Sequence, residues 1–486
     1  MNLKSNLMTV EIKNICCIGA GYVGGPTMSV IADKCPEIQI NVVDFNELRI
    51  KEWNSNNLSE LPIYEPGLKE IVGRCRGKNL HFTSEVKKNI SIADMIFISV
   101  NTPTKKKGVG AGQASDTKWV EACARDVAKF AKGHTIVVEK STLPVRTAEV
   151  IKKILDSSKL YNSNNEKVKT FEVLSNPEFL AEGTAINDLE FPDRVLIGGD
   201  DKQSIELLKN IYLNWVPNEK IIQTNIWSSE LAKLTANAFL AQRVSSINSI
   251  GAICEATGAD VREVARAIGS DSRIGSKFLD SGPGFGGSCF KKDILNLVYL
   301  ANYFGLPEVA NFWEAVVDLN IWHQSRISEL IVKKLFGSVS GKKIVILGFA
   351  FKANTNDTRE SSAINICKNL MEEGANLLIH DPKVSIKQVE MALKELHSNH
   401  TNGIYKDSEC GGSWQHSNKI KDIFINADAV VILTEWEEYS LIKWSEVSKQ
   451  MRSPAWIFDA RSIVNHNKVI EAGLNLWRIG DGSNFI

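Results

Sequence analysis

Short, continuous apolar runs recur along the first part of the chain, and most of them end at a glycine or a polar residue. A parallel sheet is covered by helices on both faces, so its strands are apolar throughout rather than alternating. Helix-length segments separate the runs, which predicts βα repeats and a doubly wound sheet. The predicted strands lie at 14–19, 40–44, 95–100, 135–139 and 171–175, with 195–198 closing the domain.

The pattern changes at Trp227 to helical spacing. Residues 229–257 contain no proline and one glycine, and apolar side chains stand at 231, 234, 238, 241, 244 and 247. Ser228 or Ser229 is a suitable N-cap, and Gly258 is a suitable C-terminal stop. A second long helical pattern covers about 307–336. We therefore predict an all-helical middle segment with a long helix.

The βα rhythm returns near Gly341 as a second copy of the first domain. Residues 343–348 repeat the pattern of 14–19, and 377–381 repeat that of 40–44. The runs at 427–434 and 456–459 continue the series. The predicted fold class is therefore α/β, with two Rossmann-like doubly wound parallel-sheet domains joined by the helical segment.

The predicted domain boundaries follow from these changes of pattern: a nucleotide-binding domain at 1–226, a central helical domain at 227–338, and a C-terminal Rossmann-like domain at 339–486. Stretches rich in Asn, Ser and Lys at 157–168 and 396–420 predict surface loops.

Composition excludes several classes of protein. The 486 residues carry 57 basic and 57 acidic side chains, so a net charge of zero offers no electrostatic footprint for nucleic acid or an anionic membrane. No apolar stretch approaches the ~20 residues of a membrane span, and no secretory signal is apparent at the start. Nine irregularly spaced cysteines indicate a reduced, cytoplasmic chain. The histidines, His397 and His400 among them, lack metal-ligand spacing, so we expect no metal.

The segment Gly19-Ala20-Gly21-Tyr22-Val23-Gly24 follows the first predicted strand directly and fits the G-x-G-x-x-G pattern of dinucleotide sites. Gly19 would allow the turn, Gly21 the approach of a pyrophosphate, and Gly24 close helix packing. Asp44 stands 20 residues after Gly24, where a carboxylate accepts from the ribose hydroxyls and favours NAD over NADP. The corresponding segment of the second copy, Gly348 to Lys352, has Ala and Phe at these positions and is not expected to hold a pyrophosphate.

The most informative stretch is the cysteine loop, residues 282–293, in which four glycines in six residues precede Cys289. The glycines leave backbone exposed beside the thiol. Free N–H groups and the nearby Lys292 would lower the thiol pKa and favour the thiolate. An isolated cysteine is more often a small buried apolar residue, and this interpretation is kept for the other eight.

With these motifs the sequence resembles the UDP-glucose/GDP-mannose dehydrogenase family over almost its whole length, and particularly its animal-type members that act on UDP-glucose. Besides the glycine turn and the cysteine loop, the matching motifs are 100–104, 139–142, 176–183, 230–237 and 348–352. The resemblance implies oxidation of UDP-glucose at C6 to UDP-glucuronate by two NAD⁺, with a thiohemiacetal and then a thioester on Cys289. It also implies a homo-oligomer, a dimer through the central helices and a hexamer of such dimers.

The resemblance assigns roles residue by residue. The catalytic set is Cys289, Lys233, Asn237, Glu178, Asp293 and Thr142. The cofactor set is Gly19, Gly21, Tyr22, Val23, Gly24, Asp44, Arg49, Val100, Asn101, Thr102, Pro103, Thr104, Ser141, Thr142, Glu182, Lys292 and Arg359. The substrate set is Glu178, Phe179, Leu180, Ala181, Lys233, Asn237, Arg273, Gly284, Phe285, Gly286, Phe351, Lys352 and Arg461, which implies a site between domains.

Within these sets the chemistry assigns functions. Lys233 and Asn237 are four apart on one helix face and would bind the developing C6 oxyanion. Glu178 would activate the water that hydrolyses the thioester, with Thr142 holding that water. Asp293 would act as, or with, the base of the first step. Taken alone, Lys233 is more often a solvated helix charge, and Asp293 an ordinary first-turn acid.

Alternatives stay open at this stage. A sister enzyme would act on GDP-mannose or a UDP-N-acetylhexosamine, and a non-catalytic nucleotide-binding scaffold would have kept the fold alone. Asp280 is a departure, because the animal-type pattern has a basic residue there.

Overall fold

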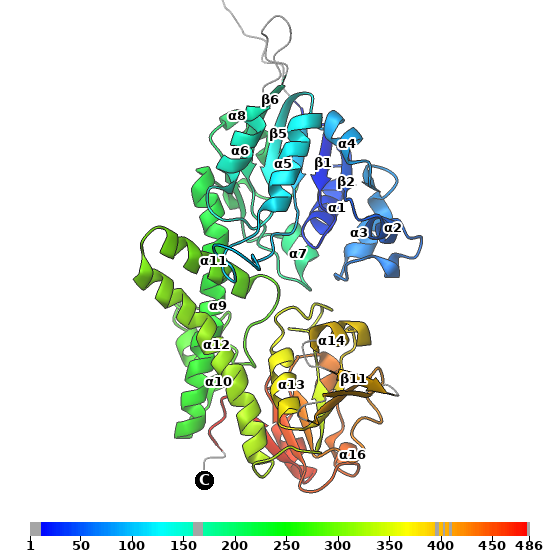
Figure 1. Cartoon of the computed structure of the whole chain (residues 1–486), viewed down its shortest axis with the longest axis vertical. Helices are drawn as coiled ribbons and strands as arrows, with labels where there is room; N and C mark the ends of the chain where they lie inside the picture. Colours follow the sequence, from blue (N-terminus) through cyan, green and yellow to red (C-terminus); the bar gives the residue numbers. More distant parts are fainter. Residues whose placement is uncertain (1–10, 159–168, 394–397, 402–403, 408–410, 484–486) are drawn as a thin grey trace, which may run out of the picture. The chain divides into compact units, whose positions relative to one another are not determined.

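The computed structural model describes residues 11–158, 169–393, 398–401, 404–407 and 411–483. By its internal contacts the chain forms two compact units, residues 1–236 and 237–486. Each contains one large sheet (Figure 1). The start of the chain, most of the predicted loop at 157–168 and His397 lie outside the described residues.

The sheet of the first unit has the strand order β3-β2-β1-β4-β5-β6-β7-β8. Its strands are β1 (Asn14–Ile18), β2 (Gln39–Val43), β3 (Leu80–Thr83), β4 (Met95–Ile98), β5 (Gly133–Glu139), β6 (Lys169–Ser175), β7 (Val195–Gly198) and β8 (Ile221–Thr224). The first six run parallel in the order of a Rossmann fold, whereas β7 runs antiparallel to β6 and is followed by β8. The prediction that 195–198 closes the domain was therefore wrong, because β8 adds a further strand.

Helices cover both faces of this sheet: α1 (Gly24–Lys34), α2 (Glu47–Trp53), α3 (Leu68–Cys75), α4 (Val86–Ile92), α5 (Lys118–Phe130), α6 (Thr147–Ser157), α7 (Ala185–Glu190) and α8 (Lys202–Tyr212). The burial of strand β1 on both faces explains why its sequence is apolar throughout. Ile15 and Cys17 belong to the core on one face of the sheet, and Cys16 and Ile18 to the core on the other. Side chains of a strand alternate between faces, so a strand buried on both sides needs apolar residues at every position.

The long helix α9 (Ile226–Thr257) begins in the first unit and continues into the second. The N-cap prediction was wrong by three or four residues: the side chain of Asn225 accepts from Ser228 N, so the helix starts earlier than Ser228 or Ser229 would allow. Gly258 follows the last helical residue with φ +85°, as its stop position requires. The other central helices are α10 (Val261–Gly269), α11 (Phe290–Tyr303) and α12 (Pro307–Lys334).

The second sheet repeats the Rossmann order in six parallel strands, β13-β10-β9-β14-β15-β16, and continues into antiparallel β12 and β11. Its strands are β9 (Lys343–Leu347), β10 (Asn376–His380), β11 (Ser398–Thr401), β12 (Ile404–Asp407), β13 (Ser413–Ser417), β14 (Ala429–Ile432), β15 (Trp456–Asp459) and β16 (Asn475–Arg478). The helices are α13 (Ser362–Glu372), α14 (Ile386–Leu393), α15 (Glu437–Ser440), α16 (Trp444–Val447) and α17 (His466–Glu471).

The predicted surface loop at 396–420 was wrong, since β11, β12 and β13 lie in it. The edge hairpin β11–β12 is made mostly of polar residues, so its sequence shows no alternation of apolar and polar positions that would predict strands. In the neighbouring β13, Trp414 is buried. The predicted fold class is confirmed: two Rossmann-like sheets with a helical segment between them in the sequence. Within the described ranges, no helix combines the length and hydropathy that a membrane span requires.

Candidate active site

The first glycine turn joins β1 to α1 in a conformation that only glycine adopts easily. Gly19 has φ +112°, and a Cβ there would stand 2.3 Å from Ser99 O. A Cβ on Gly24 would stand 2.0 Å from Gly19 O, so this glycine lets the helix approach the turn. An added Cβ at Gly21 would meet nothing within 4 Å, so space is open at the position where a pyrophosphate approaches the backbone.

Asp44 lies at the end of β2 and is buried beside this turn. Its Oδ2 accepts from Ala20 N at 3.0 Å and its Oδ1 from Asn46 N at 2.9 Å. The Arg49 guanidinium lies 3.4 Å from Oδ2. The carboxylate is thus fixed by backbone donors and neutralised on one side by a half-exposed arginine.

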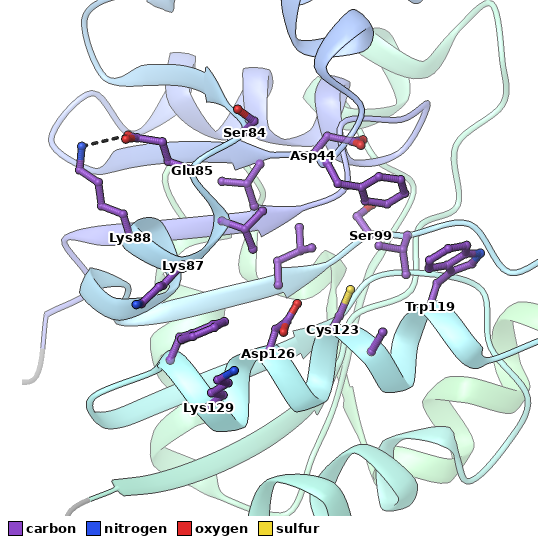
Figure 2. A pocket seen from close by; sticks show the side chains of 18 of the residues that line it. Asp44, Ser84, Glu85, Lys87, Lys88, Ser99, Trp119, Cys123, Asp126 and Lys129 are labelled. Carbon is purple, nitrogen blue, oxygen red and sulfur yellow. Dashed lines mark hydrogen bonds and ion pairs between the residues drawn. The ribbon is translucent and has the colours of Figure 1, made fainter.

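A cavity of about 970 Å³ opens in front of the turn and includes Gly19, Gly21, Asp44 and Arg49 in its lining. Figure 2 shows Asp44 on one side of it, and Trp119, Cys123, Asp126 and Lys129 along α5 on another. Phe45 and Trp119 stack at 5.6 Å between ring centroids, and both are partly exposed in the cavity lining. Bare backbone, a fixed carboxylate and flat aromatic faces suit the pyrophosphate, ribose and base of a dinucleotide.

The second Rossmann turn uses its carboxylate differently. Asp381, at the end of β10, accepts from both Phe349 N and Ala350 N through Oδ2 at 2.8 and 2.9 Å. A Cβ on Gly348 would stand 2.3 Å from Thr434 Cβ. The N–H groups that would face a phosphate are therefore directed to an internal carboxylate.

In the first unit, Lys233 of α9 and Glu178 form a buried ion pair with Nζ and Oε1 3.2 Å apart. The ammonium also lies 5.5 Å from the centre of the Phe179 ring. Glu178 Oε2 accepts from Leu180 N at 2.7 Å. Lys233 is only 3% exposed, so it is not a solvated helix charge.

Lys140, at the end of β5, is a second buried lysine in this unit. Its Nζ donates to Asn176 Oδ1 at 2.9 Å and to Tyr212 OH at 3.2 Å. Burial lowers the pKa of Lys140 to about 8, although the Glu178 carboxylate opposes this shift. Two buried ammonium groups and one carboxylate thus gather around the carboxyl ends of β5 and β6.

In the second unit, Cys289 stands immediately before α11. Its thiol is partly exposed, whereas the other seven cysteines of the described ranges are buried. Ser288 Oγ lies 3.4 Å from Sγ. The partial positive charge of a helix N-terminus favours a thiolate at this position.

Asp293, one turn into α11, is 1% exposed. Its Oδ2 accepts from Asn237 Nδ2 at 2.6 Å, and Lys292 Nζ lies 3.8 Å from Oδ1. Asp293 is therefore a buried, partnered carboxylate rather than an ordinary first-turn acid. The same contact ties α9 to the helix that begins at the thiol.

The cysteine loop packs against the C-terminal sheet domain within the second unit. A Cβ on Gly287 would stand 3.0 Å from the Phe351 ring, and Gly287 N donates to Arg359 O at 2.9 Å. Arg461 donates to Phe351 O and Leu433 O, both at 2.9 Å. The glycines therefore give the loop its close approach to Phe351, next to two cationic side chains, Arg461 and Lys352.

Comparison with known proteins gives three consecutive matches to models of one family. They are the NAD binding domain of the UDP-glucose/GDP-mannose dehydrogenase family over residues 13–216, its central domain over 227–322 and its UDP binding domain over 345–466. The chain belongs to the UDP-glucose/GDP-mannose dehydrogenase family.

Individual members are similar over nearly their full length. The UDP-glucose 6-dehydrogenase of Bos taurus is 54% identical over 476 residues, covering 97% of this chain and 93% of that protein. UDP-glucose 6-dehydrogenase 4 of Arabidopsis thaliana is 51% identical over 477 residues, covering 96% of each. The structure of a UDP-glucose dehydrogenase from Pyrobaculum islandicum superposes with a TM-score of 0.80 at 27% identity, covering 98% of this chain and 99% of that one.

Two arginines that the family resemblance assigns to the site pair with nearby aspartates in this chain. Arg273 is exposed and pairs with Asp271, with 2.6 Å between Nη2 and Oδ2. Arg359 pairs in the same way with Asp357, also at 2.6 Å. Asp280, the residue that departs from the animal-type pattern, is exposed. The assigned roles of the two arginines stay predictions.

Most of the other residues assigned to the cofactor lie in the first unit, whereas Lys292 lies in the second. Ser99, Val100 and Asn101 line the cavity at the end of β4, and Thr102 Oγ1 donates to Thr142 O at 2.9 Å. Sequence reasoning missed Trp119 and the buried Lys140. Phe45, directly after Asp44, was a usable signal for an aromatic wall. Lys140 stands beside Glu139 at the end of an apolar run, where a buried charge is unusual.

Replacing Asp44 by Ala should weaken NAD binding by about 10- to 100-fold, because hydrogen bonds to charged groups contribute about 1.5–3 kcal/mol. Binding of the sugar nucleotide should change by less than about two-fold, since the sugar nucleotide is assigned to other residues. Calorimetric titration with each ligand separates the two effects. Arg49→Ala, which removes the ion pair but keeps the carboxylate, should weaken NAD binding less than Asp44→Ala. Equal loss of both affinities would contradict the assignment of Asp44 to the cofactor.

Proposed function

We propose that this chain oxidises the C6 alcohol of UDP-glucose twice, giving UDP-glucuronate through a covalent intermediate on Cys289. The activity is that of an NAD-dependent UDP-glucose 6-dehydrogenase. Identity above 50% to animal and plant enzymes of that name, over almost the whole chain, supports the activity. The observation that carries the mechanism is the thiol of Cys289, partly exposed at the start of α11 among otherwise buried cysteines of the described chain.

The cavity in front of the first glycine turn suits a dinucleotide, as described above. We assign its binding to Gly19, Gly21, Gly24 and Asp44, with Tyr22, Val23, Arg49 and the segments 100–104 and 141–142 around them. When bound there, NAD⁺ would supply the hydride acceptor for both oxidations. The protein's own groups then have to move protons, stabilise an oxyanion and hold the half-oxidised sugar.

Cys289 holds the sugar between the two oxidations. Its thiolate adds to the C6 aldehyde and forms a thiohemiacetal, and oxidation of that adduct leaves a thioester. The position before α11 supports this role, because the helix N-terminus favours negative charge on sulfur. A covalent adduct also keeps the aldehyde from diffusing away.

Lys233 and Asn237 supply positive charge and an N–H donor for the oxyanion at C6. They lie four residues apart on α9, hence on one side of the helix. One such donor typically contributes about 3–4 kcal/mol to the transition state. Asp293, which accepts from Asn237, is assigned with Lys233 to removal of the first proton.

Glu178 is assigned to activating the water that hydrolyses the thioester, and Thr142 to holding that water. Glu178 is buried and paired with Lys233, which holds its carboxylate in a fixed position. Phe179, Leu180 and Ala181 follow it in the sequence and are assigned with Phe285, Phe351, Lys352 and Arg461 to the sugar nucleotide.

Assembly into dimers through the central helices, and of dimers into hexamers, is part of the proposal. Apolar side chains on α9, α11 and α12 are exposed in the single chain, among them Phe239, Tyr303, Phe312 and Trp322. A second copy of the chain would cover such a surface. The eight cysteines of the described ranges form no disulfides, which supports a location in the reducing cytoplasm.

Sedimentation velocity at micromolar concentration should give a mass of two or six chains. Phe312→Arg places a charge in the proposed interface and should shift the distribution toward smaller species, whereas exposed Leu441→Arg should not. A monomer at all concentrations would contradict the proposed assembly.

A panel of sugar nucleotides tests the substrate. With UDP-glucose, absorbance of NADH should rise by two equivalents per substrate, because the alcohol is oxidised to the acid. GDP-mannose and UDP-N-acetylhexosamines should give much slower turnover. The proposal fails if UDP-glucose is not turned over while another sugar nucleotide is.

Cys289→Ala should reduce UDP-glucuronate formation by at least ~10³-fold, because removal of a catalytic nucleophile has effects of this size or larger. NADH binding, followed by fluorescence, should be unchanged. Cys254→Ala, a buried thiol outside the proposed site, is the matched control and should keep the parental rate. Acid formation at the parental rate in Cys289→Ala would rule out the covalent mechanism.

A further inference from the structure

Two glutamates outside the assigned catalytic set meet in the interior of the first unit. Glu139 is the last residue of β5 and Glu230 lies in the first turns of α9, and each is 2% exposed. Their side chains hydrogen-bond to each other. Two ionised carboxylates in contact would repel strongly in a buried site, so one of the pair must carry a proton.

The hydrogen bonds show which glutamate is ionised. Glu230 Oε2 accepts from Arg146 N at 2.6 Å, and its Oε1 accepts from Ala148 N at 2.8 Å. Both oxygens therefore act as acceptors, as in a carboxylate. Glu139 Oε2 is buried and has no partner among the described residues, which costs far less for a neutral acid than for an anion.

The pKa directions agree with this arrangement. Burial raises the pKa of Glu139 well above its usual range, and the adjacent Glu230 charge adds to the shift. Burial also raises the pKa of Glu230, but the N–H groups of Ala148 and Arg146 oppose that rise. The proton therefore lies on Glu139, which donates to Glu230.

Glu230 takes the place of a local cap for α6. The residue before this helix, Arg146, gives no side-chain cap and is held at φ +78°, in the left-handed region that residues with a Cβ rarely adopt. Backbone in this state persists only where the surroundings fix it. Here the fixing group is a carboxylate from α9.

The other charged groups near the pair have their own partners. Lys140 donates to Asn176 and Tyr212, and Lys233 pairs with Glu178. The Arg146 guanidinium lies over the Trp227 ring, and Glu149 pairs with Lys153. Opposite Glu139, the adjacent strands carry Ile98 and Ser175, which are uncharged.

We propose that Glu139 and Glu230 form a positioning pair with one proton, which holds the turn 140–147 and the start of α6 against α9. The turn carries Ser141 and Thr142, and Lys233 follows Glu230 by less than one helical turn. The pair thus fixes the turn and the start of α9, two segments that the proposed function assigns to the reaction. The effect that we infer on catalysis therefore rests on that proposed function.

Two isosteric substitutions separate the roles. Glu139→Gln still offers an N–H donor to Glu230, so kcat with UDP-glucose should stay within about two-fold. Glu230→Gln turns an amide NH₂ toward Arg146 N or Ala148 N, and kcat should fall by about 10- to 100-fold, with a smaller change in KM, because misplaced catalytic groups cost rates of this order. Equal effects of the two substitutions would overturn the assignment.

Thermal stability against pH tests the proton without any assay of activity. An unfolded glutamate titrates near ~4.3, and Glu139 in the folded chain titrates above this. The contribution of Glu139 to the stability of the parental protein then falls as pH rises above ~4.3, because only the unfolded chain releases this proton there. Glu139→Gln lacks this loss, so its Tm relative to the parental protein should rise as pH increases above about 5.

Glu149→Gln, which lies in α6 at an ion-paired and more exposed position, is the control. Its pKa is lowered by Lys153, so its Tm difference from the parental protein should be flat above pH 5. A flat difference for Glu139→Gln as well would overturn the proposal. If the parental protein does not oxidise UDP-glucose but the Tm difference of Glu139→Gln still rises with pH, the proposed function is refuted. The proton between Glu139 and Glu230 is then still supported.

Discussion

Charge buried at the carboxyl ends of β5 and β6 must be compensated inside the protein, because water does not reach it. Five ionisable side chains meet this constraint in the first unit: Glu139, Lys140, Glu178, Glu230 and Lys233. Their partners are opposite charges, backbone N–H groups, the neutral side chains of Asn176 and Tyr212, and a retained proton. Because each partner comes from a different segment, satisfying the charges also fixes the segments.

The two Rossmann sheets have the same order of their six parallel strands but differ in the hydrogen bonds of the turn after the first strand. In each, an aspartate at the end of the second strand accepts from the residue after the first glycine. Asp381 also takes the next N–H group, from Ala350. In the first copy the corresponding residue is Gly21, which faces open space. One additional hydrogen bond, from Ala350 N, and larger side chains at Phe349 and Ala350 separate the closed turn from the turn suited to phosphate.

The fold was largely predictable from the sequence, because strands buried on both faces leave continuous apolar runs such as 14–18 and 343–347. The exceptions were strands whose burial is incomplete or whose partners are distant in sequence, such as β8 and the polar edge hairpin β11–β12. Propensity and periodicity are local, whereas edge pairing depends on what lies beside the strand.

The candidate site was predictable where spacing encodes geometry, as in Gly19–Gly24 with Asp44, and in the glycines before Cys289. Burial of Lys233 and Asp293 was not predictable from spacing, because a charged helix residue is solvated more often than not. Nor could the pairing of Glu139 with Glu230 be read from the sequence, since the two stand 91 residues apart. Their contact depends on tertiary packing of α9 against the end of β5.

The closed turn at Asp381 has a consequence for stoichiometry. A chain built from two copies of one nucleotide fold has two places at which a dinucleotide could be held. Because the N–H groups of the second turn donate to Asp381, the duplicated fold does not give the chain a second dinucleotide site. The C-terminal copy is instead available for a different phosphate ester. One polypeptide can then bind cofactor and substrate on separate copies of the same fold.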